Sequence, residues 1–199
     1  MDDWRNAEAT FREFQLIADR LKKPHPELLR ICVRSLVSGF DTIASSLKRM
    51  AARAAAKKNT EISPREQNVL FDYAEPPYPG APPRRIETST RESLNVAIVV
   101  YARARGSEPP MDTSPLGDPA IPAAFAGTLT IFDRICHPEE LTALEVTKSD
   151  IVMLQKTLKW ADSLRKWLGR ERLAEIEEVR EEIEISFEEA RQKLRRRQP

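Results

Sequence analysis

The chain has few of the residues that build disulfide frameworks and metal centres. Its 199 residues include only two cysteines and two histidines. Cys32 and Cys136 lie in apolar helical stretches without a CxxC spacing, which predicts two buried thiols in a reducing compartment. No second His, Cys or carboxylate stands at metal-ligand spacing from His137, so we expect no zinc site, and no cofactor motif occurs elsewhere.

Glycine, long apolar runs and an excess of one charge are lacking as well. None of the six glycines belongs to a phosphate-binding loop, which argues against a nucleotide-hydrolysing enzyme. No apolar run approaches the ~20 residues that span a bilayer, and the amino-terminal residues lack a signal pattern, so we expect a soluble, cytoplasmic protein without a membrane partner. Because 32 Lys and Arg balance 31 Asp and Glu, an RNA contact would need a local basic patch.

Apolar residues at helical spacing dominate the rest of the chain. They recur every three or four residues, and no segment shows the period-two alternation of a half-buried strand. The predicted helices cover roughly 2–21, 26–58, 63–73, 89–105, 120–137, 147–168 and 170–197. We therefore predict an all-α protein, an up-down helical bundle of five to seven helices with Pro-rich connecting loops and a charged C-terminal helix.

Capping residues mark where several of these helices begin. The 63–66 segment, Ser-Pro-Arg-Glu, combines an N-cap, a proline at the first helical position and a glutamate at the third. The 89–92 segment, Ser-Thr-Arg-Glu, is a second capping box. The apolar, β-branched run at 94–101 would also suit a strand, but no partner strand is evident, so we favour a buried central helix. Prolines make 75–85 and 106–119 loops.

Gly169 is the predicted boundary between the helical bundle and the last helix. The helix that begins at the cap-like 147–150 segment, Thr-Lys-Ser-Asp, is expected to stop at this glycine. We therefore predict a helical bundle over 1–169 and a charged C-terminal helix over 170–199. That helix has a narrow apolar seam, which is typical of a helix that packs against one neighbour, in the bundle or in a partner.

Arg134 and His137 are the candidate catalytic residues. They lie three positions apart at the end of an apolar helix that Pro138 terminates, so both side chains reach the same small volume. A metal-free ribonuclease needs such a pair, because the histidine transfers a proton near neutral pH and the arginine stabilises charge on the phosphorane. In the structural alternative, Arg134 pairs with an acidic neighbour such as Asp133 or Glu139, and His137 bonds a carbonyl group at the helix C-terminus. Spacing alone favours the structural interpretation.

The order of features between 130 and 161 is similar to that of a group of bacterial helical proteins related to the HEPN superfamily. The shared features are an Arg-x-x-His-Pro end of a core helix at 134–138, a turn at 144–150 and a Trp-Ala pair at 160–161. The resemblance implies an up-down bundle that often dimerises, with paired Arg and His at the interface. It also implies either a ribonuclease of toxin or phage-defence type or an inactive binding module.

The spacing of the pair departs from that of active members of the superfamily. In those proteins four to six residues separate the arginine from the histidine, whereas two separate Arg134 from His137. We therefore expect a HEPN-like binding or scaffold module of a bacterial toxin–antitoxin or phage-defence system. As partners we expect a second copy in a homodimer, and a protein such as an antitoxin, or RNA. The alternative is a metal-independent endoribonuclease that uses Arg134 and His137 in an altered geometry.

Overall fold

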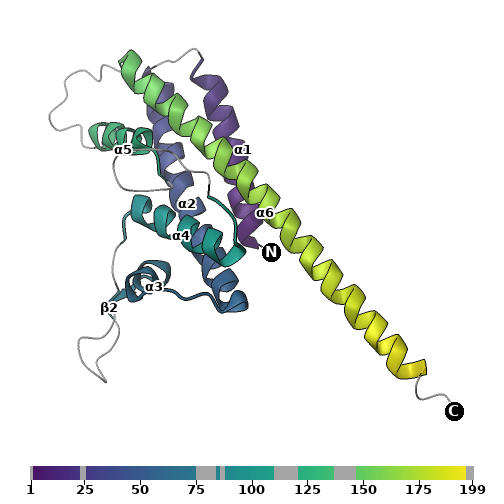
Figure 1. The fold of residues 1–199 in the computed structure, drawn as a ribbon. Helices are drawn as coiled ribbons and strands as arrows, with labels where there is room; N and C mark the ends of the chain where they lie inside the picture. Colours follow the sequence, from purple (N-terminus) through teal and green to yellow (C-terminus); the bar gives the residue numbers. More distant parts are fainter. Residues whose placement is uncertain are drawn as a thin grey trace.

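Six helices make up nearly all of the described part of the chain, seen here in a computed structural model (Figure 1). The structure describes residues 2–22, 26–74, 84–85, 88–109, 121–136 and 147–195. Within these ranges the helices are α1 (Asp2–Arg20), α2 (Pro26–Lys58), α3 (Pro64–Phe71), α4 (Thr90–Arg105), α5 (Ala123–Cys136) and α6 (Lys148–Arg195). The prediction of an all-α bundle with five to seven helices is confirmed.

A two-residue strand pair is the other regular element in these ranges. β1 (Tyr73–Ala74) pairs antiparallel with β2 (Arg84–Arg85). The pair is too short to form a sheet layer, so the fold class does not change. Most of the predicted proline-rich loops, 75–85 and 106–119, lies outside the described residues.

Local signals mark the ends of α3 and α4. The Ser63 hydroxyl accepts a hydrogen bond from the Glu66 backbone N–H, and the Glu66 carboxylate accepts one from the Ser63 backbone N–H at 2.9 Å. At 89–92 the structure shows the N-cap half of the predicted box. The Ser89 hydroxyl accepts from the Glu92 backbone N–H, and the Glu92 carboxylate accepts from Arg65 at 3.1 Å. Gly106 ends α4 at φ 65°, in the left-handed region where glycine carries no Cβ penalty. Residues 94–101 therefore lie inside a capped helix.

α2 is the spine of the bundle, because α1, α4 and α5 pack on it, while α6 crosses over α1 and α5 (Figure 1). Aromatic rings from α1, α2, α5 and α6 meet around Phe40. Its ring centroid lies 4.8 Å from those of Phe14 and Phe125 and 5.7 Å from that of Trp160. Each buried ring adds ~1.5–3 kcal/mol of hydrophobic free energy, so this cluster holds four helices together. None of the described helices is apolar over a span that would cross a bilayer.

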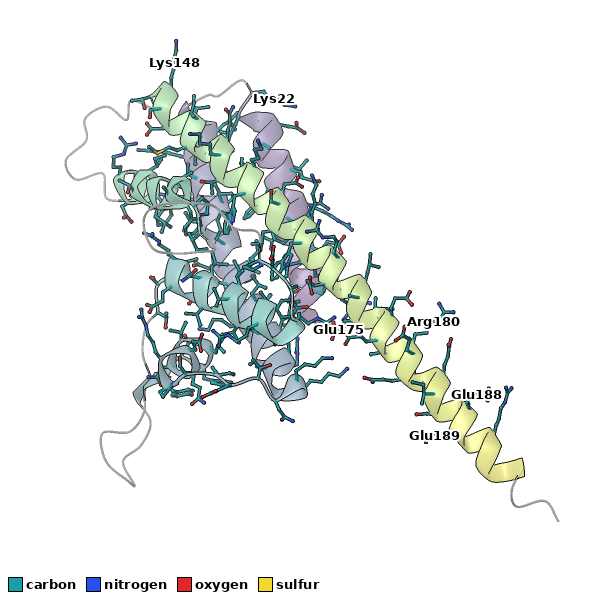
Figure 2. The ribbon with its side chains drawn as sticks, in the orientation of Figure 1. Lys22, Lys148, Glu175, Arg180, Glu188 and Glu189 are labelled. Atoms are coloured by element: carbon teal, nitrogen blue, oxygen red, sulfur yellow. The ribbon has the colours of Figure 1, made fainter. Side chains whose placement is uncertain are left out.

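α6 is one continuous helix, so the predicted stop at Gly169 is wrong. A glycine inside a helix costs about 1 kcal/mol relative to alanine. The buried residues that precede it, Trp167 and Leu168, outweigh that cost by packing on the bundle. The predicted boundary between 1–169 and 170–199 thus falls inside α6. Its first half lies on the bundle. The projecting half, from Arg172 onward, keeps ion pairs to the bundle as far as Glu182 and then extends beyond the other helices (Figure 2).

Candidate functional site

Arg134 lies in the last turn of α5 and contacts the first turn of α6. Its Nη2 atom donates a hydrogen bond to Oδ1 of Asp150 at 2.7 Å. The sequence suggested Asp133 or Glu139 as acidic partners, but the described partner is Asp150, 16 residues further on. The Asp150 side chain is 10% exposed and that of Arg134 is 46% exposed. This ion pair joins the end of α5 to the start of α6.

Asp150 is also a capping residue of α6. Its Oδ2 atom accepts hydrogen bonds from the backbone N–H and the hydroxyl of Thr147, both at 2.9 Å. The Asp150 backbone N–H in turn donates to the Thr147 hydroxyl at 3.2 Å, so the cap predicted at 147–150 is confirmed. Burial by itself raises the pKa of this carboxyl group, but the hydrogen bonds from Thr147 and the nearby Arg134 hold the pKa of Asp150 below its usual value. Asp150 is therefore ionised at neutral pH and neutralises Arg134.

His137, the second predicted catalytic residue, lies outside the described residues. The pairing of Arg134 with His137 therefore stays a prediction. At this end of α5 the guanidinium group of Arg134 already has a carboxylate partner. The Asp150 carboxylate offsets part of the positive charge that Arg134 would offer to the phosphate groups of RNA.

Metal-binding residue types do not gather in the described part of the chain. No group of three or more His, Cys, Asp or Glu side chains in that part is arranged to hold a metal ion. Cys32 is a buried, free thiol, as predicted, and burial raises its pKa. The side chain of Cys136 lies outside the described residues. Cys32 is thus a packing residue and not an activated nucleophile.

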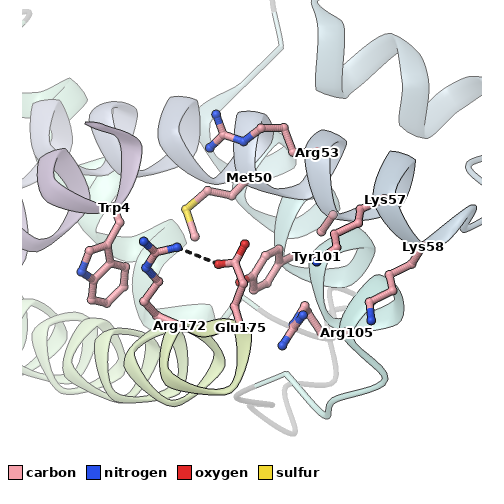
Figure 3. A pocket seen from close by; sticks show the side chains of 10 residues that line it. Trp4, Met50, Arg53, Lys57, Lys58, Tyr101, Arg105, Arg172 and Glu175 are labelled. Atoms are coloured by element: carbon pink, nitrogen blue, oxygen red, sulfur yellow. Dashed lines mark hydrogen bonds and ion pairs between the residues drawn. The ribbon is translucent and has the colours of Figure 1, made fainter. Parts of the chain in front are cut away.

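A cavity of about 520 Å³ opens where α6 leaves the bundle (Figure 3). Two aromatic, five basic and one acidic side chain contribute to its lining, which comprises Trp4, Met50, Arg53, Ala54, Lys57, Lys58, Tyr101, Arg105, Arg172 and Glu175. Burial, with Glu175 nearby, raises the pKa of Tyr101 to about 12, so its hydroxyl stays protonated. The composition of the cavity lining would suit an anionic ligand if the basic side chains had no acidic partners.

Each basic side chain of this cavity has a carboxylate partner. Arg53 pairs with Asp3 at 2.7 Å and Arg172 with Glu175 at 2.8 Å. The other three basic side chains form the ionic seam through four ion pairs. These are Lys57 with Glu182 (3.6 Å), Lys58 with Glu178 (3.3 Å), and Arg105 with Glu178 (3.0 Å) and with Glu171 (3.6 Å). Five carboxylates offset these five cations, although Asp3 is shared with Arg49, so the lining offers a phosphate group little of its positive charge. The ionic seam instead fastens α6 to α2 and α4.

The opposite face of this part of α6 is apolar and exposed. We name it the outward row, and its members are Leu173, Ile176, Ile183 and Phe187. These side chains are between 48% and 68% exposed. At about 100° of rotation per residue, each lies roughly 140–180° around the helix from Glu178, which the ionic seam holds against the bundle. A helix that presents acidic groups inward and apolar groups outward is arranged to bind something outside its own bundle.

Comparison of the chain with family models, with curated proteins and with solved structures gives no match. The HEPN-like resemblance therefore stays a prediction, and no relative lends an activity to this chain. The two candidate sites are the junction of Arg134 with Asp150 and the outward row of α6.

Proposed function

We propose that the chain is a non-catalytic helical binding module that docks a partner through the projecting half of α6. The observation that carries this proposal is the outward row. Its apolar side chains are exposed to water, while the ionic seam holds the opposite face of the same helix against the bundle. Single exposed apolar residues are ordinary, but several large apolar side chains that share one stripe of a helix indicate an interaction surface. We further propose that the chain is a HEPN-like module of a bacterial toxin–antitoxin or phage-defence system. The all-α bundle is compatible with this proposal.

The state of Arg134 supports a binding role over a ribonuclease. Its guanidinium group is paired with Asp150, and Asp150 caps α6. The Asp150 carboxylate offsets the charge of the guanidinium group, so Arg134 would stabilise a phosphorane less strongly than an arginine without an acidic neighbour. A catalytic arginine is expected to point its donors at the reacting group and not at a structural carboxylate.

The ribonuclease alternative is tested with purified protein and labelled RNA in EDTA. We expect no cleavage from the wild type or from the His137→Ala variant. Cleavage that leaves 2′,3′-cyclic phosphate ends, spares DNA and disappears in His137→Ala would show an enzyme and overturn the proposal.

Docking is tested with a photo-cross-linking amino acid at position 187, in cells that produce the chain. Position 166 is the matched control, because the Lys166 side chain is also exposed, at 63%, but lies where α6 crosses the bundle. We expect a covalent adduct with a protein from position 187 and none from position 166. Equal labelling from both positions, or no adduct from position 187, would contradict a docking role for the outward row.

A further inference from the structure

We propose that the partner of the outward row is a second copy of this chain, and that two α6 helices pair antiparallel as a short coiled coil. The inference rests on the proposed function, because it names the occupant of the same surface. It follows from the repeat of apolar positions in α6, from the lack of support for its projecting half and from the distribution of its charges.

The apolar positions between 173 and 194 follow a heptad repeat. With Leu173 at position a, the a positions are 173, 180, 187 and 194, and the d positions are 176, 183 and 190. Six of these seven positions are apolar, and the exception is Arg180. The repeat covers about three heptads, the length from which such a pattern indicates a coiled coil.

The projecting half of α6 has little to stabilise it within one copy of the chain. The side chains of 183–189 are all exposed. Two ion pairs within the helix, Arg180–Glu184 and Arg191–Glu188, are exposed to solvent and add little stability. Isolated helices shorter than ~12–15 residues are marginal in water, and β-branched isoleucines lower the helix propensity further. A packed apolar neighbour is therefore the missing source of stability.

The charges along α6 select the antiparallel orientation. Between 171 and 189 there are nine Glu and two Arg, whereas between 191 and 197 there are five basic residues and no acidic one. A parallel pair would place the acidic stretches side by side and Arg180 against the partner's Arg180. An antiparallel pair places the basic end of each copy along the acidic stretch of the other. Like-charge repulsion disfavours the parallel pair, so the charges favour the antiparallel one.

One antiparallel register satisfies both packing and charge. It centres on position 185, and each a position then meets a d position of the partner. The opposed pairs are Ile183 with Phe187, Ile176 with Leu194, and Arg180 with Ala190. Arg180 thus meets the smallest residue of the repeat. Glu177 lies beside Arg191 of the partner, because e positions flank e positions in an antiparallel pair. The two bundles lie at opposite ends of roughly 30 Å of shared helix, so the dimer is a two-headed scaffold.

The first test is the mass of the full chain in solution. Light scattering at tens of micromolar should give twice the mass of one chain. The Ile183→Glu, Phe187→Glu double variant should be a monomer. Ile185→Glu is the matched control, because Ile185 is 61% exposed but lies outside the heptad positions, and it should remain a dimer. A monomeric wild type, or dissociation by Ile185→Glu alone, would overturn the inference.

The second test fixes orientation and does not depend on the folding of the glutamate variants. In a chain with Cys32→Ala and Cys136→Ala, one sample carries Ile176→Cys and another Leu194→Cys. After mixing and oxidation, a disulfide should link 176 to 194, and neither variant should link to itself. A disulfide between two copies of the Leu194→Cys variant would show a parallel pair and overturn the inference. These outcomes are independent of the RNA-cleavage assay, which tests the proposed function alone.

Discussion

Replacing Asp150 by alanine should lower the free energy of unfolding by about 2 kcal/mol. The change removes the acceptor of three hydrogen bonds, two from Thr147 at 2.9 Å and one from Arg134 at 2.7 Å. Loss of the capping interaction costs ~1 kcal/mol. Loss of the charge-assisted bond to Arg134 costs ~1 kcal/mol more, because water rehydrates the half-exposed guanidinium group. For a chain of this length the sum corresponds to a fall of roughly 4–8 °C in the thermal midpoint.

A double-mutant cycle, measured by urea unfolding, separates the two contributions. Arg134→Ala should cost ~1 kcal/mol on its own and almost nothing when Asp150 is already alanine, because the two residues act through one ion pair. Asp133→Ala is the control, since Asp133 is exposed and adjacent to Arg134 in sequence, and it should change stability by less than ~0.5 kcal/mol.

Acid should remove the same stabilisation. The pKa of Asp150 is lowered from its usual 3.8 in the folded chain, so the unfolded chain takes up the proton first as the pH falls. A depressed folded-state pKa contributes stability that is present above 3.8 and is lost as the pH falls through the folded-state value. The stability difference between the wild type and Asp150→Ala should therefore be full at neutral pH and shrink in acid below 3.8.

The opposite pattern would refute this account of Arg134. If Arg134→Ala left the thermal midpoint unchanged while abolishing an RNA-cleaving activity of the wild type, the arginine would be catalytic and its bond to Asp150 incidental. A midpoint difference that persisted undiminished in acid would likewise exclude the Asp150 carboxylate as its source.

Two glycine substitutions with opposite expected signs test the helix packing, each by thermal unfolding. Gly39→Ala should cost about 1–2 kcal/mol, because an added Cβ would lie 2.5 Å from the buried ring of Phe14, and an unchanged midpoint would contradict the close approach of α1 and α2. Gly169→Ala should instead add about 0.5–1 kcal/mol, since the nearest atom to an added Cβ is in the Trp4 ring at 4.0 Å and the backbone is helical. A lowered midpoint in this variant would indicate that the helix ends at Gly169 after all.

The helices were predictable where local chemistry decides them. The bounds of α2 match the predicted 26–58, the capping box at Ser63 forms both expected hydrogen bonds, and Ser89 forms the expected N-cap bond. The stop at Gly169 was wrong because a glycine only weakens a helix, and packing of the residues before it decides whether the helix continues.

The candidate site was less predictable, because its contacts join residues far apart in the chain. Sequence identified Arg134 and the cap at Asp150 separately, but not the ion pair between them, since that depends on how the end of α5 meets the start of α6. The acidic residues of the ionic seam do follow a helical spacing that was visible in the sequence. Their partners, Lys57, Lys58 and Arg105, come from other helices and gave no such signal.

Sequence by itself determined that this protein is helical, where most of its helices begin and end, and that its last helix carries an apolar row among charges. These are properties of residues within one or two turns of each other, so periodicity and capping are enough to specify them. Only the tertiary structure decided which face of α6 meets the bundle. The pairing of Glu178 with Lys58 and Arg105 turns the acidic face inward, and the apolar row consequently faces outward, available to a partner.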